Sequence, residues 1–128
     1  MKLRYALFAL AVSVSSIAPF AQAAPALDDP STVVTVMQFS ARNAATRAQL
    51  QERMGAIRDY IRKQPGFVDN ALMENRNTGN KPDFVGVSRW KSFKDWEALW
   101  LKPEFQKLVA AAGEVGEINP GTYSPIKR

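Results

Sequence analysis

Apolar and polar positions recur along the chain with two periods, and their order predicts the fold. Apolar and β-branched residues fill both alternating faces of Thr32 to Ser40, as in a strand that is buried on both sides. Thr46 and Gln49 form a capping-box pattern, and Pro65 with Gly66 ends the segment that follows. Between them, apolar side chains recur at helical spacing: Leu50, Met54, Ile57 and Ile61. The pattern therefore predicts a strand followed by an amphipathic helix.

The next segment predicts a hairpin. Residues Phe67 to Asn75 and Asp83 to Trp90 each have strand composition, and the stretch 76–82 between them is rich in turn residues. Both strands are therefore expected to pair with each other.

Two helical pieces and a last strand follow. Ser92 is expected to cap the first helix through Asp95, and Pro103 suits the first turn of the second, which spans Glu104 to Ala112. One face of the first helix is apolar and contains Phe93, Trp96, Leu99 and Trp100. Residues 117–126 predict a strand that a turn at Asn119-Pro120-Gly121 interrupts.

The order β-α-β-β-α-β is that of an α+β, ferredoxin-like fold with an antiparallel sheet. Its helices cover only one face of the sheet, yet the first and third strands have apolar residues on both faces, as Val34 and Val36 show against Met37 and Phe39. A second copy of the same sheet is the simplest cover for the other face. We therefore expect a homodimer, a dimeric α+β barrel whose sheets enclose a cavity.

The N-terminal region has the three parts of a secretory signal. Lys2 and Arg4 precede an apolar run, and Ala21-Gln22-Ala23 has the small-x-small form of a cleavage site. We expect a signal peptide at 1–23, a flexible lead-in at 24–31 and one domain at 32–128 in an exported protein, periplasmic or secreted. The apolar run is too short to span a bilayer, so no membrane association is expected after cleavage.

Composition limits the chemistry of this domain. The chain of 128 residues has no Cys and no His, which excludes disulfides, thiol nucleophiles, imidazole bases and the usual zinc sites. The formal charge is +5, and removal of the signal lowers it by two. Because basic and acidic residues alternate, nucleic acid is not an expected partner. No glycine-rich motif offers a cradle for a nicotinamide or flavin cofactor, so neither cofactor nor metal is expected.

Three segments resemble the antibiotic biosynthesis monooxygenase family of dimeric α+β barrels. These are Ile-Arg-Lys-Gln-Pro-Gly-Phe at 61–67, the hairpin end Trp90-Lys91-Ser92, and Leu-Lys-Pro-Glu-Phe at 101–105, and the resemblance spans about Val33 to Ile126. It implies the fold and, for some members, oxidation of quinols and polycyclic phenols by O2 without a cofactor. Other members degrade haem, and many have no assigned reaction.

The chain departs from its relatives at their histidines. Matched on Phe105, two of these positions are Leu99 and Glu104 here, and a third, from haem-degrading relatives, falls near Val109. Haem degradation of that type is not expected, because the chain has no imidazole to ligate iron.

The resemblance and the strand patterns together nominate eight site residues. The expected catalytic residues are Trp90, Gln38, Tyr123 and Arg89, and the expected substrate-binding residues are Asn70, Ser88, Trp100 and Phe84. Phe84, Ser88 and Trp90 share one strand face that mixes aromatic and small polar residues, as a cavity wall would.

Each of these residues has an ordinary alternative. Trp90 and Trp100 would also serve as aromatic core, Gln38 as a solvent-exposed strand residue, and Tyr123 as part of a dimer seam. Glu74, on the face of Asn70, suits a surface charge better than a base. Two functions stay open: a monooxygenase that oxidises a small aromatic or quinol-type molecule with O2, and a non-catalytic ligand-binding or stress-associated barrel.

Overall fold

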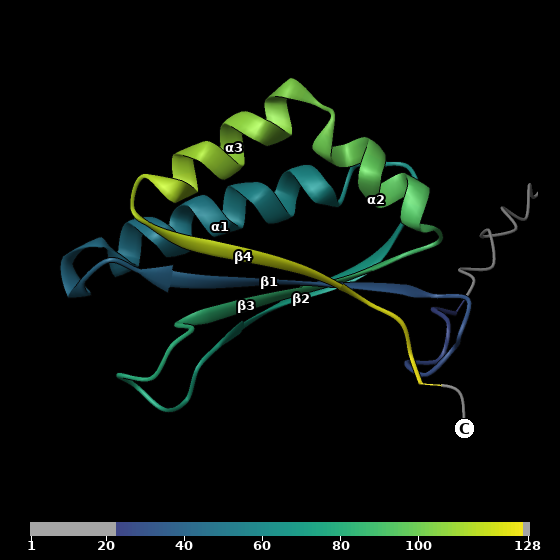
Figure 1. Ribbon diagram of the computed structural model, residues 1–128, viewed down its shortest axis with the longest axis horizontal. Helices are drawn as coiled ribbons and strands as arrows, with labels where there is room; N and C mark the ends of the chain where they lie inside the picture. Colours follow the sequence, from purple (N-terminus) through teal and green to yellow (C-terminus); the bar gives the residue numbers. More distant parts are fainter. Residues whose placement is uncertain (1–22, 127–128) are drawn as a thin grey trace, which may run out of the picture.

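Four strands and three α-helices form two layers in this computed structural model, which describes residues 23–126 (Figure 1). The expected signal peptide, apart from Ala23, lies outside the described residues. In chain order the elements are β1 (Val33–Ala41), the 3-10 turn η1 (Ala44–Thr46), α1 (Arg47–Ile61), β2 (Phe67–Glu74), β3 (Phe84–Trp90), α2 (Phe93–Trp100), α3 (Pro103–Gly113) and β4 (Gly116–Tyr123).

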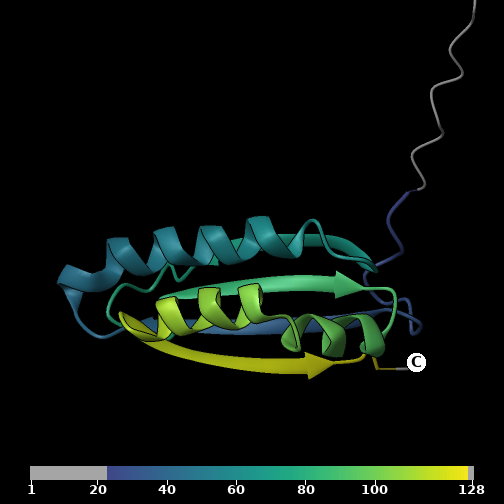
Figure 2. The same cartoon turned by 90° about the horizontal axis from the view of Figure 1, so that it is seen from above.

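The sheet has the order β2-β3-β1-β4, and every neighbouring pair is antiparallel. All three helices lie on one face of it, as the view from above shows (Figure 2). The predicted hairpin of β2 and β3 is confirmed, and so is the ferredoxin-like α+β fold.

Strand alternation divides the sheet into two faces. The helix-side face has the buried residues Thr35, Met37 and Phe39 of β1, and the register sets Ser88, Gly86 and Phe84 of β3 beside them. The open face, defined by the intervening residues, has no helix over it in the described part of the chain (Figure 1). Its centre is formed by half-buried valines: Val34, Val36, Val85 and Val87.

The core fills the space between the helix-side face and the helices. All four apolar positions of the predicted first helix are buried: Leu50, Met54, Ile57 and Ile61. At the other end of the sheet, aromatic rings form a continuous cluster, in which the Trp96 ring centroid lies 5.6 Å from that of Trp90 and 5.5 Å from that of Trp100. The cluster attaches α2 and α3 to β3.

Gly66 is required where the chain turns from α1 into β2. Its φ is +79°, and a Cβ there would lie 2.2 Å from the Asp95 side chain. The predicted cap of α2 is confirmed, since the Ser92 hydroxyl accepts from the Asp95 amide at 3.2 Å.

Three local predictions are wrong. The capping box joins Asn43 and Thr46, one turn earlier than expected, because the chain enters α1 through η1. Phe93 is 48% exposed, since α2 turns only its Trp96 and Leu99 side to the core. β4 continues through Pro120 without a turn; as an edge strand it pairs on one side only, and so it tolerates proline.

Both terminal segments lie at one end of the sheet, below its open face (Figure 1). The lead-in forms a turn in which the Asp29 amide donates to the Ala26 carbonyl, and the Arg89 side chain donates to the carbonyl of Pro25. No helix of the described residues is long and apolar enough to cross a membrane.

Trp96 and Phe93 allow a matched test of the aromatic cluster. We expect Trp96→Ala to lower the free energy of unfolding by about 3–5 kcal/mol, because it removes a buried ring, and Phe93→Ala to cost well under half of that. Urea titration measures both. Equal losses would contradict the packing of α2.

Candidate functional site

A cleft between α1 and the β2 edge of the sheet brings apolar and polar side chains together. Its deep part, the inner pocket, has a free volume of about 10 Å³. Apolar residues from both layers line it, with Asn70, Ser88 and Arg58 as its polar members: Met37, Phe39, Met54, Ile57, Ile61, Leu72 and Gly86. That volume suits about one water-sized molecule.

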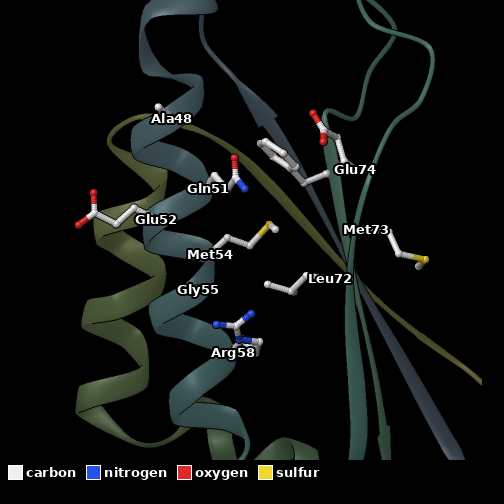
Figure 3. A pocket seen from close by; sticks show the side chains of 10 residues that line it. Ala48, Gln51, Glu52, Met54, Gly55, Arg58, Leu72, Met73 and Glu74 are labelled. Carbon is white, nitrogen blue, oxygen red and sulfur yellow. The ribbon is translucent and has the colours of Figure 1, made fainter.

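The cleft widens outward into an outer groove of about 630 Å³, within the range of small-molecule sites. Met54, Leu72 and Arg58 line both parts, so the two are continuous. Figure 3 shows Met54 and Gln51 extending from α1 toward β2, and Leu72 extending from β2 toward α1. Met54 and Met37 are unbranched, so their side chains can rearrange to admit a larger guest.

A row of polar side chains crosses the helix-side face at the inner pocket. Thr35, Ser88 and Asn70 are register partners on β1, β3 and β2. The Trp90 indole N–H donates to Thr35 Oγ1 at 3.3 Å, and Arg62 Nε donates to Asn70 Oδ1 at 3.1 Å. Hydrogen-bonding groups thus extend from the buried indole to the protein surface.

Arg47 contacts two residues, Phe84 and Glu74, at the end of the outer groove away from the inner pocket. Its guanidinium lies 4.7 Å from the ring centroid of Phe84 and 2.7 Å from Glu74 Oε1. The hydrogen bond to Glu74 raises the pKa of Arg47. Arg47 Nε also lies 3.7 Å from the buried carboxylate of Asp83.

Asp83 is the buried anchor of this end. Burial by itself raises the pKa of Asp83, but hydrogen bonds from Lys81 Nζ at 2.6 Å and the Ala41 amide at 2.7 Å, with the charges of Lys81 and Arg47, lower it below its ordinary value. Its carboxylate therefore stays charged in the folded protein.

Four of the eight predicted site residues lie on the helix-side face. Asn70 and Ser88 line the inner pocket, and Phe84 lines the outer groove. Trp90 is fully buried behind them in the aromatic cluster, where it meets Phe67 edge-on. Its contact with the polar row is through Thr35.

Three predicted residues lie on the open face instead. Gln38 is exposed there and lines a separate groove with Ser40 and Asn119, while Tyr123 is 54% exposed at the end of β4. Arg89 is buried, and its guanidinium forms two hydrogen bonds with Asp69, at 2.7 and 2.5 Å. The bond to Asp69 raises the pKa of Arg89, and the Arg89 donors lower that of Asp69.

Within one protomer, the structure does not bring the eight nominated residues together at one site. The wall of Phe84, Ser88 and Trp90 lies under the helices, whereas Gln38, Tyr123 and Arg89 face away from it. Trp100 packs edge-on against Phe105, with centroids 4.9 Å apart, in the cluster between α2 and α3. Of the eight nominated residues, Asn70, Ser88 and Phe84 line the cleft of the protomer.

Sequence reasoning missed Thr35, Arg58 and Arg62. Thr35 is the polar residue of a strand that is otherwise apolar on its helix-side face, so the strand pattern of the sequence could have identified it. Arg58 lies on α1 and Arg62 is the C-cap residue of that helix, but their position near β2 depends on how α1 packs on the sheet.

The residues of 23–126 contain no group of three or more acidic side chains close enough together to hold a metal ion. The polar row, made of amide, hydroxyl and guanidinium groups, can hydrogen-bond the oxygens of an organic molecule.

No protein-family model matches the sequence, and a comparison with curated proteins finds no relative. Solved structures do match. SnoaB, a cofactor-independent oxygenase from Streptomyces nogalater, is 19% identical over 77% of this chain and 96% of its own, with a TM-score of 0.66. A candidate antibiotic biosynthesis monooxygenase from Deinococcus radiodurans is 16% identical over 75% and 94%, with a TM-score of 0.64.

A dimeric ferredoxin-like protein of unknown function from Jannaschia is 11% identical over 73% of this chain and 98% of its own, with a TM-score of 0.62. At such low identities these structural matches show a shared fold and no more. It is the fold that the three sequence segments implied.

The charge of Asp83 gives the fold a defined acid dependence. Because its pKa is lower in the folded state than its unfolded value near 3.8, the carboxylate stabilises the fold above that value, and this contribution is lost as the pH falls through the folded pKa. We expect Asp83→Asn to melt several degrees below the wild type at pH 7. Between pH 7 and pH 3 its melting temperature should fall less than that of the wild type. Calorimetry of both proteins at the two pH values measures this, and an equal difference in melting temperature at pH 7 and at pH 3 would contradict the role of the Asp83 charge.

Proposed function

We propose that the protein is an exported, homodimeric oxygenase that oxidises a small phenolic or quinol-type molecule with O2, without a cofactor, in the cleft between α1 and β2. The observation that supports it best is the polar row Asn70–Ser88–Thr35 at an apolar pocket. The fold shared with SnoaB, a cofactor-independent oxygenase, points the same way.

The reaction makes modest demands on the protein. An electron-rich phenolic substrate that has lost a proton can transfer an electron to O2; the two radicals combine at carbon to form a peroxide, and loss of water leaves a carbonyl. In sum, the CH2 group of an anthrone, or of the keto tautomer of a phenol, and one O2 become one C=O group and one H2O. The protein has to exclude water, orient the ring and stabilise the anion.

The cleft offers groups for each task. Met37, Met54 and Leu72 provide apolar walls, and the Asn70 amide and the Ser88 hydroxyl lie where they can hydrogen-bond the substrate's oxygens. Trp90 acts through Thr35, whose hydroxyl it holds, and is thus a positioning residue.

A second function, ligand binding without turnover, is favoured by the small inner pocket. Its free volume of about 10 Å³ is far below that of an aromatic ring, so a ligand must displace side chains or remain in the outer groove. A protein that only binds its ligand in that groove would need no access of O2 to the polar row.

Oxygen uptake separates the two functions. With a panel of anthrones and naphthoquinols, we expect Asn70→Ala and Ser88→Ala each to lower kcat/KM by about tenfold or more, because each removes a hydrogen-bonding group at the reacting ring. Gln38→Ala, on the other face of the same sheet, is the matched control and keeps its rate.

Two outcomes would count against the oxygenase. Uptake no faster than the uncatalysed reaction across the panel favours the binding function. Loss of uptake in Gln38→Ala alone would move the site to the open face.

The homodimer would cover the open face with a second copy. That face has the half-buried Val36 and Val87 at its centre and Met73, 48% exposed, at its edge. Two such faces packed together would bury this apolar surface and close the barrel.

Light scattering tests the dimer. We expect Val87→Lys to yield monomers, because it places a charge in the apolar contact, while Glu104→Lys on the helix layer leaves the dimer intact. A wild-type monomer at micromolar concentration would contradict the sheet-to-sheet arrangement.

A further inference from the structure

Gly55 stands in the middle of α1, where glycine weakens a helix and nothing in the packing requires it. Its backbone is helical, and a Cβ there would meet only Arg58 Nη2, at an ordinary 3.9 Å. Other side chains would stabilise α1 more. What the glycine provides is space, because Gly55 lines the outer groove and leaves it open beside Arg58.

Arg58 provides a positive charge beside Gly55 in the outer groove. It lines both the inner pocket and the outer groove, and its guanidinium lies along α1 beside Gly55 (Figure 3). Among the described residues, it donates one side-chain hydrogen bond, from Nε to the exposed carboxylate of Asp59 at 3.2 Å. Its Nη groups therefore have donors available for a ligand.

The carboxylates near the groove do not fully neutralise the positive charge of Arg58. Glu74 is paired with Arg47 at the far end, 2.7 Å away. Glu52 also lines the groove, but its carboxylate lies on the side of α1 away from β2 (Figure 3). Asp59 offsets part of the Arg58 charge from the solvent side, and Arg62, bonded to Asn70, adds a second cation at the inner end. The inner end of the groove is therefore net positive.

We propose that the outer groove binds a planar aromatic molecule that has an anionic substituent, such as a carboxylate. The ring lies over Gly55, between the Met54 and Leu72 side chains, and the anionic group is bound by the Nη donors of Arg58. A guanidinium matches a carboxylate with two parallel hydrogen bonds, which fixes the orientation of the ring. This inference specifies the substrate class of the proposed function and shares its cleft.

A pair of probes tests the charge preference. Isothermal titration of the purified protein with 2-naphthoate and with the neutral 2-naphthalenemethanol should give a dissociation constant about tenfold lower for the anion. Arg58→Gln should remove this preference and leave the neutral probe unchanged. Lys63→Gln, an equal charge change at an exposed neighbouring position, should keep the preference.

Gly55→Leu tests the location without the risk of unfolding. The leucine should fill the groove and abolish binding of both probes while it raises the melting temperature, since leucine favours a helix over glycine. A higher melting temperature with unchanged binding would overturn the site. Equal loss of the preference in Arg58→Gln and Lys63→Gln would overturn the role of Arg58.

The outcome is separable from that of the proposed oxygenase. Selective naphthoate binding without oxygen uptake supports this inference and counts against the oxygenase. Oxidation of neutral and anionic phenols at equal rates, unchanged in Gly55→Leu, supports the oxygenase and overturns this inference.

Discussion

A two-faced sheet with helices on only one side is the constraint on which the rest of this structure depends. Because successive strand residues point to opposite faces, Met37 and Phe39 enter the core under α1, while Val36 and Gln38 belong to the open face. Each strand therefore contributes to two environments at once. The cleft under the helices and the apolar open face are the two results.

The helix-side face combines a dense core with a polar row. Most of this face is closed by large apolar side chains, and the aromatic cluster around Trp96 secures one end of the helix layer. Thr35, Ser88 and Asn70 interrupt the apolar surface in register, and the Trp90 indole satisfies the most buried of them. Buried polar groups with partners specify one arrangement of the strands, and here they also give the cleft its chemistry.

The shared fold and the local chemistry support different parts of the functional argument. The match to SnoaB and to the other solved structures covers about three quarters of this chain and establishes the architecture. Function depends on the site, and there amide, hydroxyl, guanidinium and carboxylate groups provide the polar chemistry, because histidine is absent from the sequence. In this cleft Arg58 lies beside Gly55, which leaves the groove open next to the guanidinium.

The sequence by itself determined the element order, the buried face of α1 and the cap of α2, because strand and helix periodicity and side-chain capping are local properties. It also placed Phe84 and Ser88 on one face of β3, since they follow the strand period, whereas the register of β2 against β3 brought Asn70 beside them. Only the tertiary structure decided which face meets the helices. That choice separated Trp90 from Gln38, paired Arg89 with Asp69, and set Arg58 over β2, since each depends on contacts between segments far apart in the chain.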